Sequence, residues 1–287
     1  MNSRALILTV MAMTAFAGNS LLCRAALNQT EIDAASFTSI RLIAGALVLW
    51  LIVRLRASRA EDKGAGQSTV GGNWWSALAL FAYAAGFSYA YVGLAAGTGA
   101  LILFGAVQVT MIGYGIYRGE RLRGIQLIGL LMAFGGLIGL MLPGLESPPL
   151  FGSVLMLGAG VAWGVYSLRG RGAGAATVVT AGNFLRSVPL ALLLSALMYS
   201  YWSLDVAGVG YAIASGALAS GVGYAIWYTA LPLLKSTTAA TVQLSVPVIA
   251  AIGGVILLSE PLTLRMALAS VAILGGIALV ILEKQAR

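Results

Sequence analysis

The chain consists almost entirely of long apolar runs that are joined by short polar connections. A helix of about 20 apolar residues is long enough to cross the hydrocarbon core of a bilayer. We count ten such runs: 5–23, 34–53, 74–93, 97–117, 124–142, 150–168, 177–199, 207–231, 238–258 and 262–282. They leave too little chain for a water-soluble domain. The pattern therefore predicts an all-α integral membrane protein with ten transmembrane helices.

The low content of charged residues supports the same fold class. Charged residues make up 9% of the 287 residues, and the set AVILMFWYC makes up 60%. A typical soluble domain has about 25% charged residues. So few charges could not cover the surface of a soluble protein of this size.

Several kinds of chemistry are excluded by the residues that the chain lacks. It has no histidine and only one cysteine, Cys23, so it has no histidine acid–base group, no histidine or cysteine metal site and no intramolecular disulfide. Adjacent carboxylates occur only as Glu61-Asp62, in the polar stretch 54–73, which is expected to be a solvated loop. We therefore expect no cofactor, no metal and no enzymatic activity.

The net charge of +8 reflects membrane topology rather than nucleic-acid binding. Arginine and lysine lie at the ends of the apolar runs, and in membrane proteins they concentrate on the cytoplasmic side. Only Arg24 and Arg265 fall on the side opposite the N-terminus, so both termini are predicted to be cytoplasmic. The basic residues on the N-terminal side are Arg4, Arg54, Arg56, Arg59, Lys63, Arg118, Arg121, Arg123, Arg169, Arg171, Lys235, Lys284 and Arg287.

The first apolar run could be mistaken for a cleavable signal peptide. Arg4, the run itself and Ala15-Phe16-Ala17 have the expected order of features. However, the same segment resembles a run in the middle of the chain, which cannot be a targeting signal. We expect residues 5–23 to be a retained helix.

An internal repeat divides the chain into residues 1–145 and 146–287. At an offset of 140, Glu120 aligns with Glu260 and Gly135-Gly136 aligns with Gly275-Gly276, while a slightly different offset pairs Arg41 with Arg186. Each unit contains five apolar runs, and an odd number places the second unit upside down in the membrane. Inverted repeats of this kind are typical of transporters, whose substrate sites lie between the repeats.

These features resemble the EamA-type ten-helix exporters of the drug/metabolite transporter superfamily. The resemblance covers nearly the whole chain and depends on three short motifs. They are Trp163-Gly164 with Ala17-Gly18 as its degenerate counterpart, the arginine in the second run of each unit, and Glu-x-Leu followed by a Gly-Gly run. The YddG-like branch is the most similar, and this implies export of amino acids, aromatic ones included, across the inner membrane.

Polar and aromatic residues inside the runs are the candidate site residues. Aromatic side chains there can pack or form a wall for a flat substrate, and buried amides can bind substrate or join helices. We expect Trp163 and its companions to line a central site near the bilayer midplane, with Lys235 at the cytoplasmic mouth. The predicted substrate-binding residues are Trp163, Tyr83, Phe87, Gln108, Gln243, Asn19, Tyr224 and Lys235.

Arg41 and Arg186 are the only basic residues within the runs. Either they bind a substrate carboxylate, or they donate to helix-end carbonyls at symmetry-equivalent places. Their equivalence under the repeat favours the structural interpretation for both. The glycines Gly135-x-x-x-Gly139 and Gly275-Gly276 are expected to allow close helix packing.

Three classes of function fit the sequence to different degrees. The favoured one is a carrier that exports small zwitterionic metabolites by alternating access without an obligatory proton, because no run contains Asp, Glu or His. The alternative is a multidrug or metabolite efflux pump coupled to a proton gradient, and a membrane enzyme or scaffold is disfavoured. The expected partners are an amino acid-like substrate and the lipid bilayer, with no nucleic acid, and the chain is expected to be a monomer.

Overall fold

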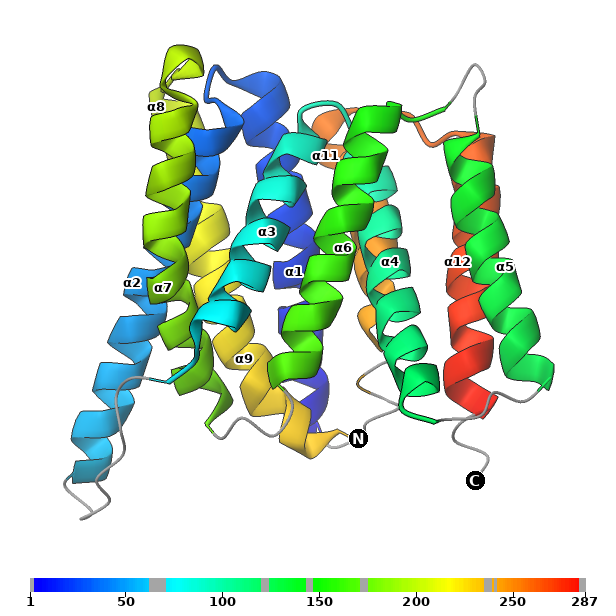
Figure 1. Cartoon of the computed structure of the whole chain (residues 1–287), viewed down its shortest axis with the longest axis horizontal. Coiled ribbons are helices and arrows are strands. Elements are labelled where there is room, and N and C mark those ends of the chain that lie inside the picture. Colours follow the sequence, from blue (N-terminus) through cyan, green and yellow to red (C-terminus); the bar gives the residue numbers. More distant parts are fainter. Residues whose placement is uncertain are drawn as a thin grey trace.

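A computed structural model describes residues 3–61, 71–119, 124–142, 147–170, 175–234, 239 and 242–283. These residues contain helices and no strands, and the helices stand side by side as a bundle (Figure 1). The long helices are α1 (Ser3–Gln29), α2 (Ala34–Glu61), α3 (Trp74–Tyr91), α4 (Ala96–Tyr117), α5 (Gly124–Met141), α6 (Leu150–Gly170), α7 (Ala176–Leu197), α11 (Ser245–Leu258) and α12 (Leu264–Glu283).

One further membrane-length segment is helical throughout but changes its hydrogen-bond pattern on the way. It consists of α8 (Val206–Ala214), the π-helix η2 (Ser215–Val222), α9 (Gly223–Ala230) and the 3-10 turn η3 (Leu231–Leu233). A π-helix of this length is unusual, and π segments inside α-helices occur frequently at functional sites. Another 3-10 turn, η1 (Tyr199–Tyr201), follows α7.

Eight of the described helices are long and apolar enough to cross a membrane. Helix α11 is apolar but has only 14 residues, and α3, with 18 residues, is rich in Trp, Tyr and Ser and is not among the eight. The protein is therefore a multi-pass membrane protein, as its apolar runs predict.

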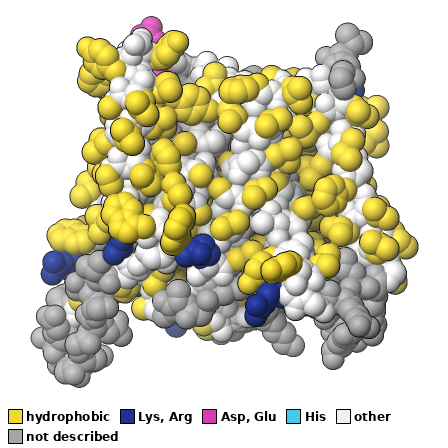
Figure 2. All heavy atoms as spheres, viewed as in Figure 1, with side chains coloured by type: hydrophobic (Ala, Val, Ile, Leu, Met, Phe, Trp, Pro, Cys, Tyr) yellow, Lys and Arg dark blue, Asp and Glu magenta, His cyan; other side chains and the backbone are white. Residues whose placement is uncertain are grey.

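The two ends of the bundle are defined by the first and last helices. Helix α1 begins and α12 ends at the same end, here called the near end, and the opposite end is the far end (Figure 1). Large apolar side chains such as Leu131 and Val271 are exposed between these ends. Figure 2 shows a mostly hydrophobic face with basic side chains gathered along its lower edge, at the near end. Such a surface suits a lipid environment.

Helix α2 differs from the prediction at its near end. The apolar run stops at residue 53, but the helix continues to Glu61, inside the stretch 54–73 that was predicted to be a solvated loop. Hydropathy shows where a helix leaves the membrane and not where it ends. The residues Arg54-Leu55-Arg56-Ala57 have good helix propensity, so the helix continues beyond the apolar run.

Helices α5 and α12 pack as a pair at one edge of the bundle (Figure 1). The backbones meet at Gly129 and Gly276, where an added Cβ on either glycine would clash with the carbonyl oxygen of the other. The prediction for Gly276 is thus confirmed, but the predictions for Gly135, Gly139 and Gly275 are wrong because no atom lies within 4 Å of their Cβ positions. The packed face of α5 carries Gly129 and Gly136, seven residues apart, and Gly135 and Gly139 point elsewhere.

Candidate functional site

A cluster of aromatic rings lies in the middle of the bundle, around Trp163 of α6. The ring centroid of Trp163 lies 4.8 Å from that of Tyr83, 5.3 Å from that of Tyr166 and 5.4 Å from that of Tyr224. The planes of Trp163 and Tyr224 are inclined by only 25°, so these two rings stack. Trp163 is partly exposed, whereas the three tyrosines are buried.

The cluster continues along α3 and reaches α1. Phe87, one turn from Tyr83, has its centroid 5.3 Å from the Tyr83 ring, and Phe16 of α1 lies 5.5 Å from Tyr224. Helix spacing explains the first pair because residues i and i+4 share one face. We call Trp163, Tyr83, Tyr166, Tyr224 and Phe87 the aromatic cluster.

The amide of Asn19 connects this cluster to the π-helix. Its Nδ2 donates to the Tyr83 hydroxyl over 3.3 Å, and its Oδ1 accepts from the Ser215 hydroxyl over 2.6 Å. Asn19 thus joins α1, α3 and η2, and the three side chains are buried. Ser215 was not among the predicted site residues. A signal was available in the pairs Ser215-Gly216 and Ser220-Gly221, which break an otherwise apolar run.

Arg41 is buried against the aromatic cluster and is only 2% exposed. Its guanidinium carbon lies 4.8 Å from the centroid of the Phe87 ring and 5.4 Å from that of Tyr83. Contacts between a desolvated cation and a ring contribute about 2 kcal/mol. Among the described residues, its Nε and Nη1 atoms have no hydrogen-bond partner.

Arg186 differs from Arg41 in that it donates to backbone carbonyl oxygens, as the structural interpretation predicts. Its Nη1 donates to the carbonyl oxygen of Gly71 over 2.6 Å and to that of Gly182 over 2.9 Å. The prediction of carbonyl partners is confirmed for Arg186 and is wrong for Arg41, where aromatic faces replace the expected carbonyls. The repeat therefore equates two positions whose side chains have different surroundings.

A second amide holds the near end of the site together. Asn183 of α7 accepts from the backbone N–H of Asn73 over 2.9 Å and donates to the Tyr166 hydroxyl over 3.4 Å. The start of α3 is also tied to α6, because Arg169 donates to the Ser76 hydroxyl. These contacts fix α3, α6 and α7, which carry four members of the aromatic cluster and Arg186.

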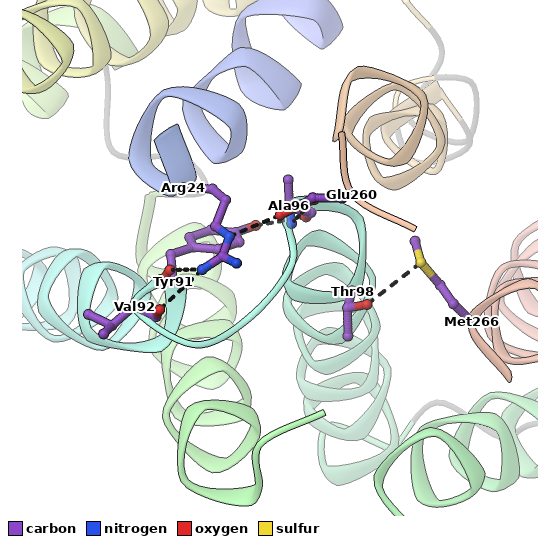
Figure 3. A network of polar contacts seen from close by, with 7 residues as sticks. All are labelled: Arg24, Tyr91, Val92, Ala96, Thr98, Glu260 and Met266. Carbon is purple, nitrogen blue, oxygen red and sulfur yellow. Dashed lines mark hydrogen bonds and ion pairs between the residues drawn. The ribbon is translucent and has the colours of Figure 1, made fainter. Parts of the chain in front are cut away.

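The far end of the bundle is tied by an ion pair (Figure 3). Arg24 of α1 lies with its Nε 2.9 Å from Oε1 of Glu260, and its Nη1 donates to the carbonyl oxygens of Tyr91 and Val92 at the end of α3. The other oxygen of Glu260 accepts from the backbone N–H of Ala96, where α4 begins. One partly buried cluster thus joins α1, α3, α4 and the α11–α12 connection. Its equivalent in the first unit, Glu120, lies outside the described residues.

Three predicted site residues are not joined to the aromatic cluster. Gln108 is buried in α4, but among the described residues no hydrogen bond links it to the cluster. Gln243 donates to the carbonyl oxygen of Ala239, four residues earlier in its own segment. Lys235 lies outside the described residues. The five predicted residues that do come together are Trp163, Tyr83, Phe87, Tyr224 and Asn19.

The described carboxylate side chains lie away from this site, at the far end. Asp33 accepts from the backbone N–H groups of Ala35 and Ser36 at the start of α2. Asp205 caps α8 by accepting from the N–H of Gly208, and this hydrogen bond lowers the pKa of its carboxyl. Within the described residues, no group of three or more His, Cys, Asp and Glu side chains could hold a metal ion.

The fold defines a multi-pass membrane protein with a polar, aromatic cluster inside the bundle. The model of the EamA-like transporter family matches residues 150–282. The chain belongs to this family, as its motifs predict.

Relatives extend the similarity over the whole chain. A protein of Pseudomonas aeruginosa, whose own function is uncharacterized, is 56% identical over 284 residues, covering 99% of this chain and 96% of the relative. The threonine/homoserine exporter RhtA of Escherichia coli K12 is 35% identical over 133 residues, or 44% of each chain. A protein with a crystal structure matches over 99% of this chain and 100% of its own, with a TM-score of 0.65 and 20% identity, which supports the fold.

Proposed function

We propose that this protein exports small zwitterionic amino acids, aromatic ones included, across the inner membrane by alternating access. The observation that carries the proposal is the composition of the central site. The rings around Trp163, one of them stacked on it, provide a surface for a flat side chain, and Asn19 and the tyrosine hydroxyls provide polar contacts in a buried setting. RhtA, an exporter of threonine and homoserine by name, supports the substrate class.

The proposed site takes residues from both repeat units. Asn19, Tyr83 and Phe87 come from residues 1–145, and Trp163 and Tyr224 come from residues 146–287. Carriers with repeats bind substrate between them, so that rocking of one unit against the other exposes the site to each side in turn.

We further propose ten spans arranged as two inverted five-helix units with both termini in the cytoplasm. A shared backbone feature supports the repeat: Gly119 and Ser259, which are 140 positions apart, both have positive φ, of 92° and 55°. The family match to residues 150–282 falls within the second unit. The excess of basic residues on the N-terminal side supports the orientation.

Transport without an obligatory proton is the proposed form of coupling. A proton-coupled carrier needs a titrating group within the membrane, usually Asp, Glu or His. The described carboxylate side chains Glu31, Asp33, Asp205 and Glu260 are all in the connections at the far end. A carrier of this kind exports because the cell interior contains more substrate. Because no Asp, Glu or His lies in an apolar run of the sequence, a proton-driven multidrug pump and an enzyme are both disfavoured.

Exchange in proteoliposomes tests the proposed function. The purified full chain is reconstituted and loaded with unlabelled L-phenylalanine or L-threonine, and uptake of the labelled amino acid is followed at equal pH on both sides. We expect uptake above that of protein-free liposomes for both amino acids. A lack of exchange for every amino acid in a broad panel, with exchange of lipophilic cations instead, would favour the multidrug alternative.

A further inference from the structure

We infer that Arg41 binds the carboxylate of the transported amino acid, whereas its repeat equivalent Arg186 serves the fold. The inference rests on the proposed function and adds to it the group that recognises the substrate. It starts from the contrast between the two arginines. Arg186 donates to two carbonyl oxygens, whereas Nε and Nη1 of Arg41 have no partner among the described residues.

Among the described residues, no carboxylate forms an ion pair with Arg41. None of the nine Asp and Glu residues lies in an apolar run of the sequence. Glu260, one of the described carboxylates, is already paired with Arg24, and Asp33 and Asp205 cap helices. Burial of a charge without a charged partner is costly. A ligand that carries a negative charge would supply the missing partner.

The surroundings of Arg41 hold its side chain in place and leave its Nε and Nη1 atoms without a hydrogen-bond partner among the described residues. The rings of Phe87 and Tyr83 lie 4.8 Å and 5.4 Å from the guanidinium carbon. Ring contacts attract the cation but accept no conventional N–H hydrogen bond of the strength that a carboxylate accepts. The arginine is thus preorganised for an oxyanion, and planar carboxylates match the geometry of its donors.

The position of Arg41 places this charge at the site already described. Tyr83, which contacts the guanidinium with its ring, also packs against Trp163 in a tilted arrangement and accepts from Asn19. An amino acid whose carboxylate meets Arg41 would therefore have aromatic faces and an amide oxygen nearby, for its side chain and its ammonium group. This arrangement selects a zwitterion over a lipophilic cation, which Arg41 would repel.

Two phenylalanine analogues test the inference on the wild-type chain. 3-Phenylpropionate keeps the carboxylate and lacks the amine, and L-phenylalaninamide keeps the amine and lacks the carboxylate. We expect the first to compete with labelled L-phenylalanine in exchange and to raise the melting temperature of the purified protein, and the second to do neither. Stronger competition by the amide than by the carboxylate would overturn the inference, however the variants behave.

Arg41→Met then tests the residue itself. We expect its apparent affinity for L-phenylalanine to fall about 10- to 100-fold, which is the loss expected for a hydrogen bond to a charged group. The variant should melt at no lower temperature than the wild type, because it removes a buried charge for which the described residues provide no carboxylate, and a methionine side chain can still pack on the two rings. Arg54→Met is the matched control, since Arg54 is exposed in the same helix and lies over the Trp50 ring, and it should exchange like the wild type.

Arg186→Met separates a binding role from a structural one. It should melt at a lower temperature, because it leaves the carbonyls of Gly71 and Gly182 without their donor. An equally large drop in melting temperature for Arg41→Met, or unchanged exchange by that variant, would overturn the inference and leave the proposed function standing. If the wild type exchanges no amino acid, the proposed function fails and the inference fails with it.

Discussion

Arg24 and Glu260 form an ion pair, with Nε and Oε1 2.9 Å apart, between residues that are 236 positions apart in the chain. Each partner also bonds to a helix end: Arg24 to the carbonyls that end α3, and Glu260 to the N–H that begins α4. Their side chains are 14% and 11% exposed, so water screens the pair only weakly. The far end of the bundle is therefore tied together by one pair of charges.

A double-mutant cycle on this pair measures its contribution. We expect Glu260→Gln to lower the free energy of unfolding by about 1–3 kcal/mol, because it leaves Arg24 without its charged acceptor. Arg24→Gln should have an effect of similar size. The double variant should lose clearly less than the two single losses together, since the pair is shared. Additive losses in detergent unfolding experiments would contradict a direct interaction.

Trp163 is predicted to matter for transport through its ring. Each of its three ring contacts contributes about 0.5–1.5 kcal/mol, and a substrate ring would use the same surface. We expect Trp163→Ala to lower L-phenylalanine exchange about tenfold or more, and Trp163→Phe to keep most of it. Trp75→Ala is the control, because this exposed residue at the start of α3 makes none of the described ring contacts. Equal exchange by wild type and Trp163→Ala, at matched reconstitution, would remove Trp163 from the site.

Much of the site could be predicted from the sequence because membrane helices are easy to read. Large aromatic and amide residues stand out in an apolar run, and the structure brings Asn19, Tyr83 and Trp163 together. The sequence is less informative about the hydrogen-bond partner of a buried amide, because that partner can lie in another helix or in the same one. Gln243, for example, bonds within its own segment, because an amide in a helix can reach a carbonyl four residues earlier.

The remaining features depend on contacts that a repeat cannot reveal. Arg41 and Arg186 align, but the carbonyl of Gly71 that satisfies Arg186 belongs to the backbone before α3. The partner of Glu260 is Arg24, a residue that the charge count treated only as a rare basic residue outside the cytoplasm. The π-helix beginning at Ser215 likewise reflects tertiary packing rather than local propensity, since Gly216 lies against the backbone of Arg41.

Ser259 is predicted to be a site of strain at the end of α11. It is the only described residue other than glycine with positive φ, at 55°, where most side chains are disfavoured. Gly119, which lies 140 positions earlier and aligns with Ser259 in the proposed repeat, has a φ of 92°. We expect Ser259→Gly to raise the free energy of unfolding by about 0.5–1 kcal/mol, and Ser259→Ala to give no gain. Equal stability of the glycine and alanine variants would show that the backbone is not strained there.

Asp205 is predicted to make stability depend on pH. The N–H of Gly208 lowers the pKa of this carboxyl from its ordinary value of 3.8 in the folded protein. A lowered folded pKa means that the contribution is complete above the ordinary pKa and is lost as the pH falls through the folded pKa. We therefore expect the wild type to melt above Asp205→Ala at pH 7, with a gap that closes in acid. Asp205→Asn keeps a capping side chain without the charge, so its melting temperature should stay above that of Asp205→Ala in acid as well.

The last prediction concerns the energy source. A pH gradient can drive accumulation only if the carrier binds a proton in one conformation and releases it in the other. The chain has no histidine, its apolar runs contain no Asp or Glu, and arginine side chains in general do not release their protons in proteins. Lys235, predicted at the cytoplasmic mouth, is the one other basic candidate, because a buried lysine can have a lowered pKa. We expect an imposed pH gradient to give no uphill accumulation of L-phenylalanine in proteoliposomes, while an outward gradient of unlabelled substrate drives uptake of label. Lys235→Ala should keep this exchange. Accumulation that follows the pH gradient and disappears in Lys235→Ala would show that the protein is a proton-coupled carrier.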